Sequence, residues 1–320
     1  MLLKAASLKI SGYTPRSFAK ARILNPHIES MRQQSIAQEP QSAYRRFALL
    51  VEYDGTDYAG WQWQPSGVSV QQRLEEAVSA ITGVPCTVVG SGRTDAGVHG
   101  FGQVAHVDVP ASCRIPVDKA TRAFNAGLPP DIRIRAVRHV PNHFHARFDA
   151  VRREYRYRIA LEHSVFCHRY MWQPNINSAT FNAAQLQACA DIFLGEHDFT
   201  TFSKRNTDTE RYVCRVERAV WSSSRDETAL PTHALLYEFS IAADRYVYGM
   251  VRSLVGTMVD VALGKRSLDD VGDALRSCDR SRNSMLAPAC GLTLWRVDYP
   301  EPLFEPLSDK DLSLSVLSSW

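Results

Sequence analysis

The sequence predicts an α+β protein made of two similar halves, each with a mostly antiparallel sheet. A chain of 320 residues with 45% apolar residues is long enough to bury one large core or two medium ones. Strand-like and helix-like hydrophobic patterns succeed one another along most of the chain. The same mixture of patterns recurs after Ala150, so we place the boundary between the halves there.

This interpretation divides the chain into four segments. Residues 1–44 are expected to form a disordered basic extension, because the first 28 residues hold five lysines and arginines and no acid. A transit peptide is the less favoured alternative. Residues 45–150 and 151–300 form the N-terminal and C-terminal α+β domains, and residues 301–320 form an irregular tail.

The first half begins with a buried strand over residues 47–53, an apolar run that leads into a turn. A helix follows, with Ser69 and Gln72 in capping-box spacing at its start and Gly83 at its end. The other elements that we expect are strands at 87–89, 103–109 and 132–137 and a short helix at 118–125.

The second half begins with a strand over residues 154–160, in which apolar and charged side chains alternate. A helix over residues 179–194 is expected to end at Gly195. A last long helix over residues 248–263 carries an apolar stripe and ends before Gly264. Two strands, at 213–221 and 234–241, lie between these helices.

Composition argues against a membrane protein and against a zinc or redox centre. No apolar run approaches the roughly 20 residues needed to span a bilayer, so we expect no membrane insertion. The seven cysteines are scattered without a C-x-x-C pair, which indicates free thiols in a reducing cytosol. His139, His143 and His145 lie close together in the sequence, but no cysteine or carboxylate completes a familiar ligand spacing. We therefore expect structural histidines and no metal site.

Positive charge is concentrated in residues 131–158. Eight arginines stand there against three acids, although the net charge of the whole chain is only +3. Arginine offers paired donors to phosphate, so this segment is typical of a surface that binds a polyanion. Solvated strand edges protected by charge would give the same count, and both interpretations stay open.

The loop Gly90-Ser-Gly-Arg-Thr-Asp-Ala-Gly97 is the most informative stretch of the chain. Its glycines allow tight turns and close approach of a large substrate. Asp95 lies between Arg93 and Gly97, a setting typical of an exposed, ion-paired carboxylate that stays anionic for use as a nucleophile or base. A turn aspartate bonded to its own backbone is the alternative that spacing alone favours. The phosphate-loop pattern G-x-x-x-x-G-K-[ST] is absent.

Motifs spread over residues 46–299 closely resemble, in the same order, those of the TruA-type tRNA pseudouridine synthases. The loop contributes Gly92-Arg-Thr-Asp-Ala-Gly-Val-His99, Gly102-Gln-Val104 and His106. The other motifs are Tyr53-Asp-Gly55, Tyr58-Ala-Gly-Trp61-Gln62, Ser69-Val-Gln71, Asn125 with Leu128-Pro129 and Asp131-Ile132, Phe144-His-Ala-Arg-Phe148, Arg153 with Tyr155 and Tyr157, Phe199-Thr-Thr-Phe202, Met250-Val-Arg252 with Gly256, and Gly291-Leu292.

The resemblance implies the pseudouridine synthase fold, with a basic cleft between the halves, and a reaction without cofactor or metal. The uracil base is detached from its N-glycosidic bond, turned, and rejoined to the ribose through carbon. Asp95 matches the family's catalytic aspartate and Arg252 the arginine that pairs with it. Tyr155 matches the tyrosine that stacks on the flipped base, and Arg93 matches an arginine that helps occupy the space the uridine leaves.

Pattern alone would favour structural roles for two of these residues. Tyr155 would be a core tyrosine with its hydroxyl at the edge, and Arg252 a solvated arginine beside an apolar helix stripe. A base inside a stem must however be extruded before it can react, and an aromatic platform with nearby cations suits that step.

The resemblance also implies partners and a location. The expected substrate is the anticodon stem-loop of tRNA, at positions 38, 39 and 40, bound in the cytoplasm by a homodimer. An RNA-binding protein without turnover ranks second, because it need not keep both Asp95 and Arg252. A small-nucleotide enzyme ranks third, because the loop lacks a phosphate-binding lysine.

Three residues depart from the family pattern. Trp63 stands where the family often has arginine, Gly249 where histidine commonly precedes Met250, and Ser253 where asparagine commonly follows Arg252. These departures put local contacts in doubt but leave the expected pairing of Asp95 with Arg252 intact.

Overall fold

The computed structural model describes residues 43–204, 211–224 and 235–304. Most of the expected basic extension and of the expected tail lies outside these residues, but Tyr44, which was placed in the extension, begins the first strand. These described residues form one compact unit, and the division into domains near Ala150 remains a prediction.

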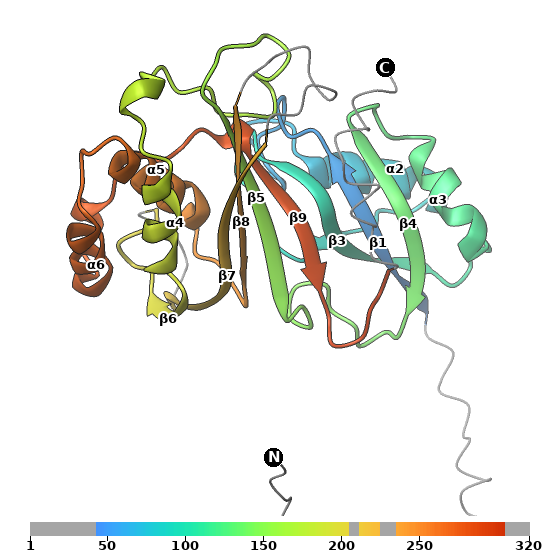
Figure 1. Cartoon of the computed structure of the whole chain (residues 1–320). Coiled ribbons are helices and arrows are strands. Elements are labelled where there is room, and N and C mark those ends of the chain that lie inside the picture. Colours follow the sequence, from blue (N-terminus) through green and yellow to red (C-terminus); the bar gives the residue numbers. More distant parts are fainter. Residues whose placement is uncertain (1–42, 205–210, 225–234, 305–320) are drawn as a thin grey trace, which may run out of the picture. The chain divides into compact units, whose positions relative to one another are not determined.

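A single sheet of nine strands runs through this unit (Figure 1). Its order is β4-β1-β3-β9-β5-β8-β7-β6, and β2 pairs with β3 beside this path. Among the described strands, all pairings are antiparallel except the parallel pairing of β3 with β9. The predicted α+β class with mostly antiparallel strands is therefore confirmed. The strands are β1 (Tyr44–Tyr53), β2 (Val88–Gly90), β3 (His99–Pro110), β4 (Ile132–Val140), β5 (Arg152–Ala160), β6 (Gly195–Asp198), β7 (Val213–Ser224), β8 (Leu236–Ala243) and β9 (Leu292–Asp298).

The helices lie in two groups at opposite ends of the strand order (Figure 1). One group packs near β1 and β4, and the other near β6, β7 and β8. The α-helices are α2 (Val70–Thr82), α3 (Val117–Asn125), α4 (Ala184–Asp191), α5 (Met250–Ala262) and α6 (Leu268–Ser277), and short 3-10 turns occur at Ser178–Thr180, Arg280–Arg282 and Ala289–Gly291.

Helix α2 begins and ends where the sequence predicts. The Ser69 side chain accepts a hydrogen bond from the backbone N–H of Gln72, and Gly83 ends the helix in the left-handed region at φ 76°. Val70, Leu74 and Val78 of α2 pack with apolar side chains of β1, β3 and α3 in one buried cluster. This cluster fixes the strands on which the glycine-rich loop is mounted.

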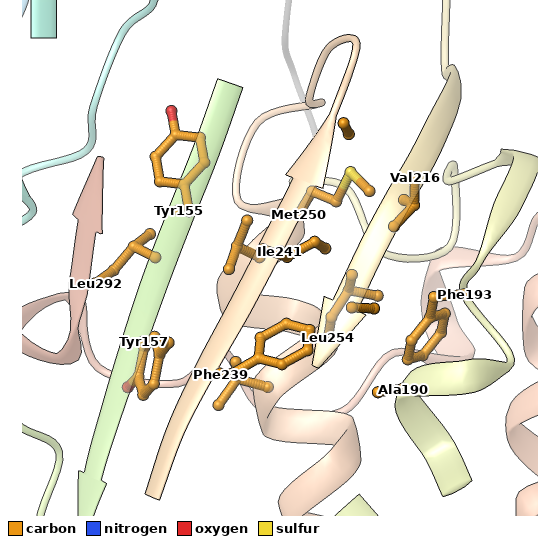
Figure 2. Close-up of a cluster of buried hydrophobic side chains, with 14 of the residues drawn as sticks. Tyr155, Tyr157, Ala190, Phe193, Val216, Phe239, Ile241, Met250, Leu254 and Leu292 are labelled. Atoms are coloured by element: carbon orange, nitrogen blue, oxygen red, sulfur yellow. The ribbon is translucent and has the colours of Figure 1, made fainter. Parts of the chain in front are cut away.

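A second, larger cluster fills the space between the strands β5, β7, β8 and β9 and the helices α4, α5 and α6. Figure 2 shows Tyr155 and Tyr157 projecting from β5 beside Ile241 and Phe239 of β8. The register explains this, because Tyr155 lies opposite Ile241, and Tyr157 opposite Phe239. One face of β5 therefore belongs to the core.

Strand β9 joins the two halves of the sheet although it comes last in the chain. It pairs with β3 at His99, directly after the glycine-rich loop, and with β5 at Tyr155. Leu294 lies opposite both Gly100 and Tyr155. The glycine-rich loop and Tyr155, about 60 residues apart in the sequence, are thereby brought to the centre of one sheet.

The predicted elements of the first half are all present, whereas the second half differs in several places. The helix expected over residues 179–194 is shorter: a 3-10 turn ends at Thr180, and α4 covers only Ala184–Asp191. The expected last helix is followed by α6, which Ser267 caps by accepting from the N–H of Asp270. Strands β6 and β9 were also not predicted, because short strands held by their neighbours carry little pattern of their own.

Candidate active site

The glycine-rich loop lies between β2 and β3 and carries Asp95 toward α5. Oδ2 of Asp95 accepts a hydrogen bond from Nη1 of Arg252 at 2.8 Å. The two side chains are 15% and 19% exposed, so the ion pair is largely but not fully covered. Asp95 is thus less exposed than its sequence setting indicates, and its partner comes from 157 residues away rather than from the neighbouring Arg93.

Arg252 is itself fixed on α5 by the segment that precedes β9. Its Nε donates to the backbone oxygen of Ala287 at 2.7 Å, and its own backbone oxygen accepts from the N–H of Ala287 at 3.1 Å. This segment approaches α5 very closely at Gly256, where an added Cβ would stand 1.9 Å from the backbone oxygen of Met285. Only glycine therefore allows the contact that orients Arg252.

Residues of the first half anchor the glycine-rich loop through side-chain and backbone hydrogen bonds. The Tyr53 hydroxyl lies 2.8 Å from Oγ1 of Thr94, and the backbone N–H of Trp61 donates to the oxygen of Thr94 at 3.1 Å. Gln103, which is fully buried, accepts from the Ser91 hydroxyl and donates to the oxygen of Gly92. Residues on both sides of Asp95 are therefore anchored, and this preorganises the carboxylate.

Arg153 ties the loop to the second half without a carboxylate partner among the described residues. Its Nη2 donates to the backbone oxygens of Ser91 at 3.1 Å and Arg147 at 2.7 Å. Its Nη1 donates to those of Ala150 at 2.9 Å and Asp244 at 3.0 Å. Burial lowers the pKa of this guanidinium. One cation therefore joins the loop of Asp95, the turn before β5 and the segment that leads into α5.

The Tyr155 side chain belongs to the larger buried cluster. It is 8% exposed, and its ring meets that of Tyr246 edge to face at 4.8 Å between centroids. Burial raises the pKa of its hydroxyl to about 12, the nearby Arg153 lowers it and the nearby Asp95 raises it. The structure therefore brings Tyr155 into the electrostatic neighbourhood of Asp95 and Arg153, although the side chain also belongs to the core.

Arg93 differs from the other three residues singled out in the sequence. Its side chain is exposed, and within the described part of the chain no ion pair or hydrogen bond involves its guanidinium. The structure thus pairs Asp95 with Arg252 and leaves Arg93 outside that pair, exposed on the same loop.

The arginine-rich segment is largely neutralised on the second face of β5. Arg156 and Arg158 both pair with Glu238, at 3.2 and 2.8 Å, and the Arg156 guanidinium stacks 3.9 Å from the centre of the Trp295 ring. Arg152 contacts three acids at 3.5 to 4.0 Å, and in β4 Arg135 pairs with Glu52. The excess of positive charge seen in the sequence is therefore offset here by acids from other segments.

The described residues contain no group of three or more histidines, cysteines or acids arranged to hold a metal ion. His145 accepts hydrogen bonds from the backbone N–H groups of Arg147 and Phe148, and Nδ1 of His106 accepts one from Ala146. None of the described helices is long and apolar enough to cross a membrane.

The structure gives each departure from the family pattern a place. The Trp63 side chain is half-exposed, and its backbone N–H donates to Oε1 of Gln71. Gly249 precedes α5 with φ 78°, in the left-handed region that disfavours most side chains. Ser253 is buried and accepts from the Asn283 side chain at 2.9 Å, which places an asparagine beside α5 from another segment.

Sequence reasoning missed the residues that hold the site together. Tyr53, Gln103 and Arg153 each stand within a recognised motif, yet no role was inferred for any of them. Gln103 lies in a strand that also holds His106 and Asp108, so its polarity alone does not single it out, although a buried amide requires partners. The bonds of Arg153 go to backbone oxygens, and a backbone acceptor has no sequence signature.

Comparison with known proteins places the chain among tRNA-modifying enzymes. A sequence model of the family described as tRNA pseudouridine synthase matches residues 49–149 and 189–300. The chain is 41% identical to tRNA pseudouridine synthase A of Porphyromonas gingivalis over 261 residues. These residues cover 81% of this chain and 99% of that protein. It is 39% identical to the protein of the same name from Brevibacillus brevis, over 80% of this chain and 100% of that protein.

Proposed function

The chain belongs to the tRNA pseudouridine synthase family, and we propose that it converts uridine to pseudouridine at positions 38, 39 and 40 of the tRNA anticodon stem-loop. In this reaction the N1–C1′ bond of uridine breaks and a C5–C1′ bond forms. C5 loses a proton and N1 gains one, so that the product is an isomer of the substrate. An RNA-binding protein without turnover is the alternative.

One observation carries the proposal of catalysis. The Asp95 carboxylate lies on the glycine-rich loop and the Arg252 guanidinium on α5, far away in the sequence. The two groups are 2.8 Å apart, and both side chains are partly exposed. An anchored, ion-paired carboxylate is a competent nucleophile or base. Asp95 can attack the sugar, attack the base or remove a sugar proton, and each route uses the same ionised group next to the target nucleotide.

The other site residues act on the nucleotide rather than on its bonds. We assign to Tyr155 the face on which the extruded uracil stacks, supported by the electrostatic influence of Arg153 and Asp95 on the pKa of its hydroxyl. Arg93 then helps fill the space that the uridine leaves in the stem, supported by its exposure on the loop of Asp95.

The proposal includes a homodimer in the cytoplasm, with a basic cleft that holds one tRNA across both subunits. All seven cysteines lie in the described part of the chain and none is in a disulfide, which supports a reducing compartment. Light scattering of the purified protein tests the dimer: twice the mass of one chain is expected, and a monomer at all concentrations would contradict it.

The test of the reaction uses two unmodified tRNA transcripts, one with uridines at positions 38, 39 and 40 and one with cytidines there. Mass-spectrometric mapping is expected to find pseudouridine in the first transcript at those positions and none in the second. Pseudouridine outside the anticodon arm would contradict the assigned positions. Tight binding of both transcripts without product would favour the alternative function.

A further inference from the structure

The turn between β4 and β5 displays an aromatic ring that the core does not use. Phe148 is 74% exposed, the second most exposed large apolar side chain among the described residues after Val165. Arg147, directly before it, is also exposed, and its guanidinium lies 5.7 Å from the centre of the Phe148 ring.

This ring is held in a fixed position. The Asp149 carboxylate accepts from the N–H of His145 at 2.8 Å, and Nδ1 of His145 accepts from the N–H groups of Arg147 and Phe148 at 3.1 and 3.3 Å. The rings of His145 and Phe148 are stacked, with centroids 4.2 Å apart and planes inclined by 29°. Binding of a ligand to Phe148 therefore costs little conformational entropy of this side chain.

Among the described residues, Arg147 is the cation of this turn that has no acidic partner. No described acid lies within ion-pairing distance of its guanidinium, whereas Arg156 and Arg158 of the following strand share Glu238. A fixed aromatic ring next to an uncompensated arginine is the combination that binds unpaired nucleotides, with a base on the ring and a phosphate on the cation.

The turn is physically joined to the loop of Asp95. A single nitrogen, Nη2 of Arg153, donates to the backbone oxygen of Arg147 at 2.7 Å and to that of Ser91 at 3.1 Å. Those two oxygens are therefore separated by no more than the sum of the two bond lengths. The turn is therefore a neighbour of the loop of Asp95.

We propose that Phe148 and Arg147 form a second nucleotide-binding point, at which an unpaired nucleotide of the substrate RNA stacks on Phe148 while Arg147 contacts its phosphate. This inference rests on the proposed function, because it takes the same RNA as occupant. A second copy of the chain is the competing occupant of the ring, and the experiment separates the two.

The test measures the Kd of an unmodified tRNA transcript in an Asp95→Asn background, so that no turnover alters the RNA. Phe148→Leu keeps the apolar character but removes the stacking face, and it is expected to weaken binding at least about fivefold, the lower end of the effect of one base stack. Phe148→Trp keeps a ring and is expected to bind within about twofold of the background protein. Equal binding by the leucine and tryptophan variants would overturn the stacking assignment.

Arg147→Gln tests the phosphate contact independently. Its slope of log Kd against log salt is expected to be smaller by about one than that of the background protein, the change for one lost phosphate contact. An unchanged slope would overturn the role of Arg147. Light scattering of Phe148→Leu is expected to give the wild-type mass, and loss of a dimer would assign the ring to a second copy instead. Product formation by wild-type protein is scored separately and tests the proposed function alone.

Discussion

The two faces of β5 use arginine in opposite ways. On the face with Tyr155 and Tyr157, Arg153 donates four hydrogen bonds to backbone oxygens and meets no carboxylate among the described residues. On the other face, Arg156 and Arg158 share the carboxylate of Glu238. The first arrangement fixes three chain segments around Asp95, whereas the second neutralises charge on a strand.

The difference shows that a count of arginines does not locate a binding surface. All three residues lie within six positions and contribute equally to the local charge excess. Their roles follow from which segments the fold places opposite them, and only the face with Arg153 adjoins the Asp95–Arg252 pair. Substitutions on the two faces are therefore expected to differ strongly in their effect.

The largest effect is expected for Arg252→Gln. Asp95 then loses its cationic partner, and the side-chain hydrogen bonds of Arg252 to Ala287 and Asp95 are lost. The single-turnover rate should therefore fall at least about 100-fold, as expected for a small misplacement of a reacting group. Arg252→Lys keeps the charge but not both contacts and should fall between the wild type and the glutamine variant. A glutamine variant with the wild-type rate and an unchanged melting temperature would break the comparison.

A smaller effect is expected for Arg153→Met. Four backbone oxygens lose their donor, and one of them, on Ser91, belongs to the loop of Asp95. The rate at saturating enzyme should therefore fall about 10- to 100-fold, the equivalent of one hydrogen bond to a charged group at about 1.5–3 kcal/mol. Arg153→Lys has three donors on one nitrogen and is expected to recover part of the rate. If the lysine and methionine variants are equally slow while equally well folded, Arg153 does not position the loop.

The smallest effect is expected on the other face, for Glu238→Gln. The carboxylate and its two arginines are partly exposed, so the free energy of unfolding should fall by no more than about 1 kcal/mol. Pseudouridine formation and tRNA Kd should stay close to wild type. Tighter tRNA binding, caused by release of Arg156 and Arg158, would place the RNA on this face and reverse the comparison.

Much of the fold could be predicted from the sequence because its signals are local. Ser69 and Gly83 bound α2 as the capping pattern indicates, and the alternation in residues 154–160 gives the two faces of β5 correctly. Strand β9 could not be predicted in its place, because its pairing with both β3 and β5 depends on segments more than 130 residues away.

The residues of the site could likewise be predicted from the sequence only in part. The loop residue Asp95 stands out through its glycines, and the family resemblance supplies Arg252 as its partner, which the structure places at 2.8 Å. The tethers to backbone oxygens, from Arg153 to Ser91 and from Gln103 to Gly92, remain invisible to sequence reasoning, because any residue offers the same acceptor.

The most direct test of the account compares wild type with Asp95→Asn on unmodified tRNA transcripts, with pseudouridine and binding measured separately. Asparagine keeps the size of the side chain but cannot act as an anionic nucleophile or base. The variant is expected to bind tRNA and to form no pseudouridine. Pseudouridine formed by Asp95→Asn at a rate near that of the wild type would contradict it.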